Sequence, residues 1–181
     1  MRETGWTIAY LSAGIFAALS IWKLLSTRHI TTIPLPPFII LGLAGGLIYA
    51  AVRLRGLSYA IMMVILLYFL QLALTPPLRT ETAIRAALWA TPIGFSFLFS
   101  GYLFKYLSRI PVGKFLLMAL IVGLAHLTVV LLFRIRPGQE LPHGLLTYQF
   151  TVGALFGTAF GIIIELLELV FRPKKEEDAF V

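Results

Sequence analysis

The sequence predicts an all-α, polytopic integral membrane protein built as a bundle of six transmembrane helices. Hydrophobic residues make up 59% of the 181-residue chain, and charged residues make up only 13%. The mean hydropathy is +0.92, and the apolar residues gather in six long segments with short polar stretches between them. A soluble domain of this length could not bury so much apolar surface, so we expect hydrocarbon around the helices.

The expected spans use nearly the whole chain, because a spanning helix needs roughly 20 residues. Residues 1–171 form one predicted transmembrane domain, and residues 172–181 form a predicted charged cytoplasmic tail. The expected spans are 6–25, 38–52, 57–74, 86–104, 115–133 and 145–164, the last with a helical extension to 171.

Proline, glycine and charge mark the breaks between spans. The first apolar stretch starts at Trp6 and exceeds the usual ~7–15-residue core of a signal peptide, so it is interpreted as an uncleaved helix. Pro36 and Pro37 precede the second span, and the Arg53-Leu54-Arg55-Gly56 sequence predicts a tight turn after it.

The later breaks follow the same rule. Thr75-Pro76-Pro77 ends the third span, and Pro92 lies in the first two turns of the fourth, where it predicts a kink. A basic turn, 105–114, and a polar loop, 134–144, separate the last three spans.

The distribution of Lys and Arg predicts an orientation. Nine of these cations fall in the N-terminus, second loop, fourth loop and tail, and six fall in the other three loops. The positive-inside rule therefore places both termini in the cytoplasm, in the inner membrane of a bacterium or archaeon. The remaining loop cations are either topology determinants or contacts for anionic lipid head groups.

Small residues at four-residue spacing predict close helix packing. In the sixth span the stripe is Gly153, Gly157 and Gly161, and in the second it is Gly42 and Gly46. Missing side chains let two backbones approach, which drives association inside lipid. We expect the second and sixth helices to be the closest pair.

Four polar residues within the spans form a candidate intramembrane site: Gln71, His126, Glu165 and Glu168. Glu165 either packs at a helix interface or faces a cavity or partner subunit, since an ionisable group in lipid suggests a function. Glu168 is spaced to pair with Arg172 at i,i+4. His126 and Gln71 either hydrogen-bond neighbouring helices or contribute to a proton relay or ligand contact.

Several classes of function lack their sequence signals. There is no cysteine, no zinc-protease, nucleophile-elbow or P-loop motif, and no Asp before Asp178. We therefore expect no catalytic residues, no metal site and no cofactor. No basic face with interleaved aromatics occurs, so nucleic acid is not an expected partner.

Thr91-Pro92-Ile93-Gly94, followed by a helix to Gly101-Tyr102 and a basic turn, resembles the MreD family of small bacterial membrane proteins. In size and layout these resemble the substrate-binding components of energy-coupling-factor transporters. The acidic residue expected upstream is absent from 87–90, so no functional residues are carried over. The resemblance implies a small, non-catalytic membrane partner of a larger assembly.

Three functions remain open at this point. The preferred one is a non-enzymatic subunit or scaffold of a membrane complex that docks through the small-residue stripes, with other membrane subunits and the lipid bilayer as partners. The alternative is a small-molecule or ion transport component with a cavity lined by Gln71, His126 and Glu165. The third is an intramembrane lipid-modifying enzyme.

Overall fold

A computed structural model of the chain describes residues 3–28, 35–73, 79–106, 113–134 and 144–171. All the regular structure in these ranges is helical. The helices are α1 (Glu3–Thr27), α2 (Leu35–Leu54), α3 (Leu57–Ala73), α4 (Thr80–Tyr106), α5 (Gly113–Arg134) and α6 (Leu145–Phe171).

Four of these helices, α1, α4, α5 and α6, are long and apolar enough to cross a membrane. The two shorter apolar helices are α2 and α3. Large hydrophobic side chains cover the outside of the bundle, and on α1, α3 and α5 many of them are about half exposed. Because such a surface is unfavourable in water, the fold is compatible with a membrane protein.

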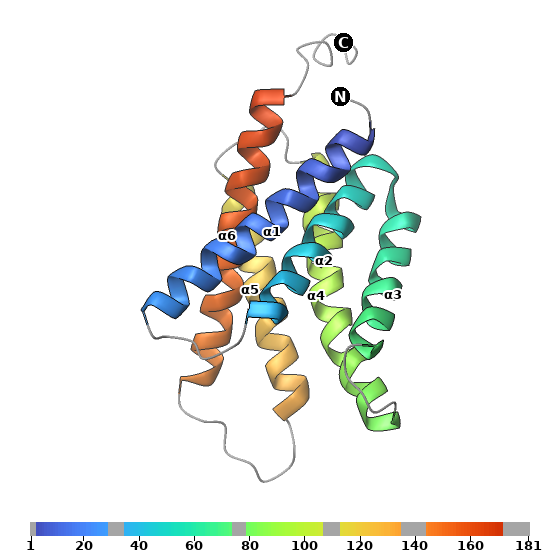
Figure 1. Cartoon of the computed structure of the whole chain (residues 1–181), viewed down its shortest axis with the longest axis vertical. Helices are drawn as coiled ribbons and strands as arrows, with labels where there is room; N and C mark the ends of the chain where they lie inside the picture. Colours follow the sequence, from blue (N-terminus) through green and yellow to red (C-terminus); the bar gives the residue numbers. More distant parts are fainter. Residues whose placement is uncertain (1–2, 29–34, 74–78, 107–112, 135–143, 172–181) are drawn as a thin grey trace.

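The packing contacts join five helices into a closed ring and leave α3 outside it. Figure 1 shows α3 at one edge of the bundle. Around the ring, α1 packs on α2, α2 on α4, α4 on α5, α5 on α6, and α6 on α1. Within the described ranges, α3 packs only on α2 and α4, at the edge of the bundle. The start of α1 and the end of α6 lie at the same end of the bundle.

Aromatic side chains fill the centre of the five-helix ring. Phe97 of α4 meets Phe156 and Phe160 of α6 edge to face, with centroid distances of 5.8 Å to each. Tyr49 of α2 lies 5.8 Å from Phe160 in the same geometry. All four side chains are fully buried, so helices that are not neighbours in the ring are joined through its interior.

Four helices begin before their predicted spans, at residues 3, 35, 80 and 113 rather than 6, 38, 86 and 115, and the starts of α2 and α4 are informative. α2 begins at Leu35 and includes Pro36 and Pro37 in its first turn, where proline's missing N–H leaves no helical hydrogen bond unmade. α4 begins at Thr80, not at 86, so Glu81 and Arg85 belong to a helix and not to a loop. Pro92 is therefore well inside α4.

The prediction that the second and sixth helices form the closest pair is wrong. Among the described residues α2 packs most closely on α1, and α6 packs on α5. Gly42 of α2 faces Gly14 of α1, backbone against backbone, and Gly46 faces Leu11 and Tyr10. Periodicity identifies the face of a helix that packs, but it carries no information about which helix covers that face.

The α6 stripe is covered by α5 along its whole length. A methyl group on Gly157 would lie 2.5 Å from the Met118 carbonyl oxygen, and one on Gly161 would lie 2.9 Å from the Phe115 Cα. One on Gly153 would lie 2.8 Å from the Val122 carbonyl oxygen. All five predicted packing glycines are therefore occupied within this chain, which leaves the two stripes unavailable to a partner protein.

Candidate functional site

A buried ion pair lies at one end of the bundle, where α1, α2 and α6 meet. The Arg53 guanidinium donates from Nη2 to Oε1 of Glu168 over 3.1 Å. The Tyr10 hydroxyl donates to the same oxygen over 2.9 Å. The Arg53 and Glu168 side chains are only 14% and 7% exposed. We refer to Tyr10, Arg53 and Glu168 as the buried polar cluster.

Local structure brings each member to this position. Arg53 lies in the last turn of α2, which ends at a tight turn where the Arg55 and Gly56 amides both donate to the Ala51 carbonyl over 2.9 Å. Gly56 has a φ of +92°, a conformation that glycine adopts without steric cost. Tyr10 belongs to the buried face of α1, and Glu168 to the buried face of α6.

Aromatic rings separate the buried polar cluster from the rest of the bundle. Trp6 stacks on Tyr10 with a centroid distance of 5.5 Å, and Tyr49 meets Tyr10 edge to face at 5.1 Å. Tyr49 in turn leads to Phe160 and the central rings. The ion pair is therefore held at low dielectric, where its members bind each other strongly and separating them is costly.

The cluster is suited to holding helices together. Glu168 Oε1 accepts two hydrogen bonds from two other helices, and the charge of the carboxylate is opposed by the guanidinium. A general base or a cation ligand would need a carboxylate that a substrate or ion can reach, whereas the Glu168 carboxylate is buried and held by Arg53 and Tyr10. The geometry thus supports a structural role in which side-chain hydrogen bonds hold α1, α2 and α6 together.

The structure assigns different roles to the two glutamates of the predicted site. Glu168 is buried and is paired across the bundle, whereas Glu165 is only half-buried. The sequence spacing predicted Arg172 as the partner of Glu168 and left Glu165 either at a helix interface or facing a cavity or partner subunit. Arg172 lies outside the described residues, and the partner observed for Glu168 is Arg53.

His126 lies on α5 against α6. Its Nε2 atom is buried without a hydrogen-bond partner among the described residues, and the Gln149 side chain of α6 is close to its ring. A methyl group at Gly153 would lie 2.9 Å from the His126 Cβ and Cδ2 atoms. The glycine therefore makes the space that the imidazole occupies, and helix packing fills that space.

The polar residues proposed to line one transport cavity do not come together. Gln71 is half-buried on α3, and α3 has no close backbone contact with α5 or α6 in the described part of the chain. His126 packs at the level of Gly153, and Glu165 lies twelve residues further along α6, about 18 Å away at ~1.5 Å per residue. The aromatic centre of the ring fills the space between these helices.

Within the described ranges, no three His, Asp or Glu side chains are grouped so that they could hold a metal ion. His29 and His143, the other two histidines of the chain, lie outside those ranges. Comparisons with protein-family models, curated proteins and solved structures find no match for this chain.

Sequence reasoning missed Tyr10 and Arg53. A signal for Arg53 was present, since alternating helix directions place the end of the second span at the same end of the bundle as the end of the sixth. An Arg at one of these ends and a Glu at the other form a natural pair. Tyr10 gave a weaker signal, as a hydroxyl among the small residues Ala9, Ala13 and Ala17.

Proposed function

We propose that this chain is a six-span protein of a bacterial or archaeal inner membrane with both termini in the cytoplasm. The apolar exterior and the four long helices support a membrane location. The start of α1 and the end of α6 lie at the same end of the bundle, which agrees with an even number of crossings. The excess of Lys and Arg in the N-terminus, second loop, fourth loop and tail supports this orientation.

Within that membrane, the protein acts as a non-enzymatic subunit or scaffold of a larger complex. The observation that carries this proposal is the filled interior: rings from α2, α4 and α6 occupy the centre. The buried charges of Arg53 and Glu168 satisfy each other. Such an interior holds helices in fixed positions, and a solute pathway would need polar groups that face open space. The resemblance to MreD proposes the same class.

The outer face of α3 is the proposed docking surface, in place of the glycine stripes that α1 and α5 cover. Its members are about half exposed and entirely apolar: Met62, Ile65, Leu66, Phe69 and Leu70. The 17 residues of α3 extend about 25 Å, which is shorter than the ~30 Å hydrocarbon core. A spanning apolar helix of another subunit would cover this face and relieve the mismatch with lipid.

Site-specific photo-crosslinking in native membranes tests this function. A benzophenone side chain at Leu66, on the outer face of α3, should give one discrete adduct heavier than the chain. The same group at Phe16, which is 63% exposed on α1, should give only diffuse lipid adducts. Ile65→Trp on the α3 face should abolish the discrete adduct, because helix contacts in membranes need close approach.

Leu120→Trp is the matched control, since Leu120 is 50% exposed on α5 and lies away from the α3 face. It should leave the Leu66 adduct unchanged. An adduct of twice the mass of the chain would indicate self-association and would contradict the subunit proposal. A purified monomer that binds or moves a solute without any partner would also contradict it.

A further inference from the structure

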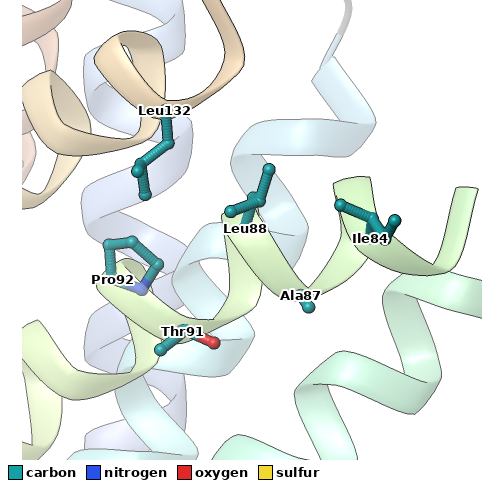
Figure 2. A pocket seen from close by; sticks show the side chains of 6 residues that line it. All are labelled: Ile84, Ala87, Leu88, Thr91, Pro92 and Leu132. Carbon is teal, nitrogen blue, oxygen red and sulfur yellow. The ribbon is translucent and has the colours of Figure 1, made fainter. Parts of the chain in front are cut away.

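A continuous apolar groove runs along the outside of the bundle between α4 and α5. It consists of two depressions, of about 280 and 400 Å³, which share Thr91 and Pro92. On the α4 side the groove extends from Ile84 to Phe99, about 22 Å at ~1.5 Å per residue. Figure 2 shows the first depression, with Leu132 of α5 facing Leu88 and Pro92 of α4.

The walls of the groove are exposed at the rim. Ile84, Phe95, Phe99, Leu124 and Leu132 are each between 43% and 56% exposed. The groove therefore opens sideways, toward the hydrocarbon, and not toward the filled centre of the ring. Its length exceeds the ~15 Å depth of one leaflet's hydrocarbon, so it can hold one whole acyl chain.

An ion pair lies in the first turns of α4, next to the end of the groove at Ile84. Arg85 Nη2 lies 2.6 Å from Oε1 of Glu81, and the two side chains are 58% and 67% exposed. In α4, Glu81 and Arg85 continue the stripe formed by Leu88, Pro92 and Phe99 at intervals of three, four and seven residues. The acid and the base therefore lie beside the Ile84 end of the groove, which we call its mouth, on the α4 face that the groove follows.

We propose that this groove binds a phospholipid with an ethanolamine head group. One acyl chain lies between α4 and α5 and passes Thr91 and Pro92. At the mouth, the lipid phosphate binds the Arg85 guanidinium, and the primary ammonium donates to the Glu81 carboxylate. The negative and positive groups of the zwitterionic head group are thus each matched by a side chain of opposite charge, Arg85 and Glu81.

The pair of charges selects this head group over two common alternatives. A phosphatidylglycerol head group has no ammonium, so its net negative charge meets repulsion from Glu81. A phosphatidylcholine head group carries a trimethylated ammonium, which has no N–H to donate to the carboxylate. The preference arises at exposed groups, so it should be about two- to fivefold, the range of an exposed ion pair.

Native mass spectrometry of the full-length chain in detergent tests the proposal, with dioleoyl phosphatidylethanolamine, phosphatidylglycerol and phosphatidylcholine as probes. The ethanolamine lipid should be retained about two- to fivefold more than either other lipid. Thr91→Phe should fill the groove and reduce retention of all three lipids. Thr91 is exposed, so the fold should tolerate the larger side chain. If Thr91→Phe does not fold, Thr128→Phe fills the groove from its α5 wall instead.

Matched controls separate the groove from the general surface. Thr151→Phe enlarges an exposed threonine on α6 whose hydroxyl, like that of Thr128, bonds its own helix, and it should leave retention unchanged. Glu81→Gln should remove the preference for ethanolamine over glycerol, and Glu3→Gln should not, although Glu3 also forms an exposed pair, with Arg55.

Equal retention of the three lipids, or equal effects of the groove and control variants, would overturn the inference. The groove is separate from the outer face of α3. The lipid preference can therefore fail while the crosslinking result stands, and the crosslinking can fail while the lipid preference stands.

Discussion

Arg53 and Glu168 are 115 residues apart in the chain, yet their side chains lie 3.1 Å from each other inside the bundle. The pair joins the end of α2 to the end of α6, two helices that have no close backbone contact among the described residues. Tyr10 of α1 completes the contact by donating to the same carboxylate oxygen. The arrangement of these three helices therefore depends on side chains at one end of the bundle.

Removing one member of the ion pair should destabilise the protein more than removing both. Glu168→Leu or Arg53→Leu should each lower the free energy of unfolding by about 3–5 kcal/mol, because a buried charge is left alone. The double variant should lie within about 1 kcal/mol of the parent or above it, since the desolvation of both charges is avoided. Chemical unfolding in mixed detergent micelles measures these values.

Glu3→Gln is the control for the ion pair, because the Glu3–Arg55 contact is long, at 3.7 Å, and exposed. Its effect should stay below about 1 kcal/mol. Additive losses in the double variant would contradict the pairing of Arg53 with Glu168.

The Tyr10 hydroxyl should contribute separately from its ring. Tyr10→Phe removes one hydrogen bond to the carboxylate and keeps the ring contacts with Trp6 and Tyr49. We expect a loss of about 1–2 kcal/mol, as for a buried hydrogen bond to a charged group. The loss should disappear in the double variant that lacks Arg53 and Glu168. A full loss in that background would show that the hydroxyl has another role.

Sequence patterns predicted the helices of this fold well, and the physical reason is simple. Long apolar runs must satisfy their backbone groups internally, so each becomes a helix. The turn at Gly56 was also predictable, since Arg53-Leu54-Arg55-Gly56 interrupts two apolar runs. The start of α4 was missed, because Glu81 and Arg85 look like loop residues until their i,i+4 pairing is considered.

The packing partners and the buried polar cluster were harder to predict. In a soluble helix, polarity marks the outer face, but here nearly every face is apolar. Gly42 and Gly153 thus identified packing faces without identifying their partners, α1 and α5. The choice between Glu165 and Glu168 depended on which side of α6 meets α1 and α2, a property of the assembled ring and not of the helix.

His126 should be replaceable without loss of stability. Its Nε2 atom is buried with no hydrogen-bond partner in the described structure, and an unsatisfied buried polar atom costs about 1–3 kcal/mol. His126→Leu removes that atom and keeps an apolar group of similar size against Gly153. Thermal unfolding in detergent should show an equal or higher melting temperature. A marked decrease would show that the imidazole makes a stabilising hydrogen bond.

Two glycine substitutions should destabilise the fold for different reasons. Gly157→Ala places a methyl group 2.5 Å from the Met118 carbonyl oxygen and 2.9 Å from the Ala119 Cα. These are backbone atoms, so α5 and α6 must separate, at a cost of about 1–3 kcal/mol. Gly56→Ala meets nothing within 4 Å, but the φ of +92° disfavours alanine by about 1–2 kcal/mol.

A second measurement distinguishes these two mechanisms. A spin-label pair across α5 and α6 should report a larger separation in Gly157→Ala and no change in Gly56→Ala, because only the first substitution acts on the helix interface. Combining the two should give additive losses, since sites without shared contacts are energetically independent. An unchanged α5–α6 distance in a stable Gly157→Ala protein would contradict the close backbone packing that holds α6 in the ring.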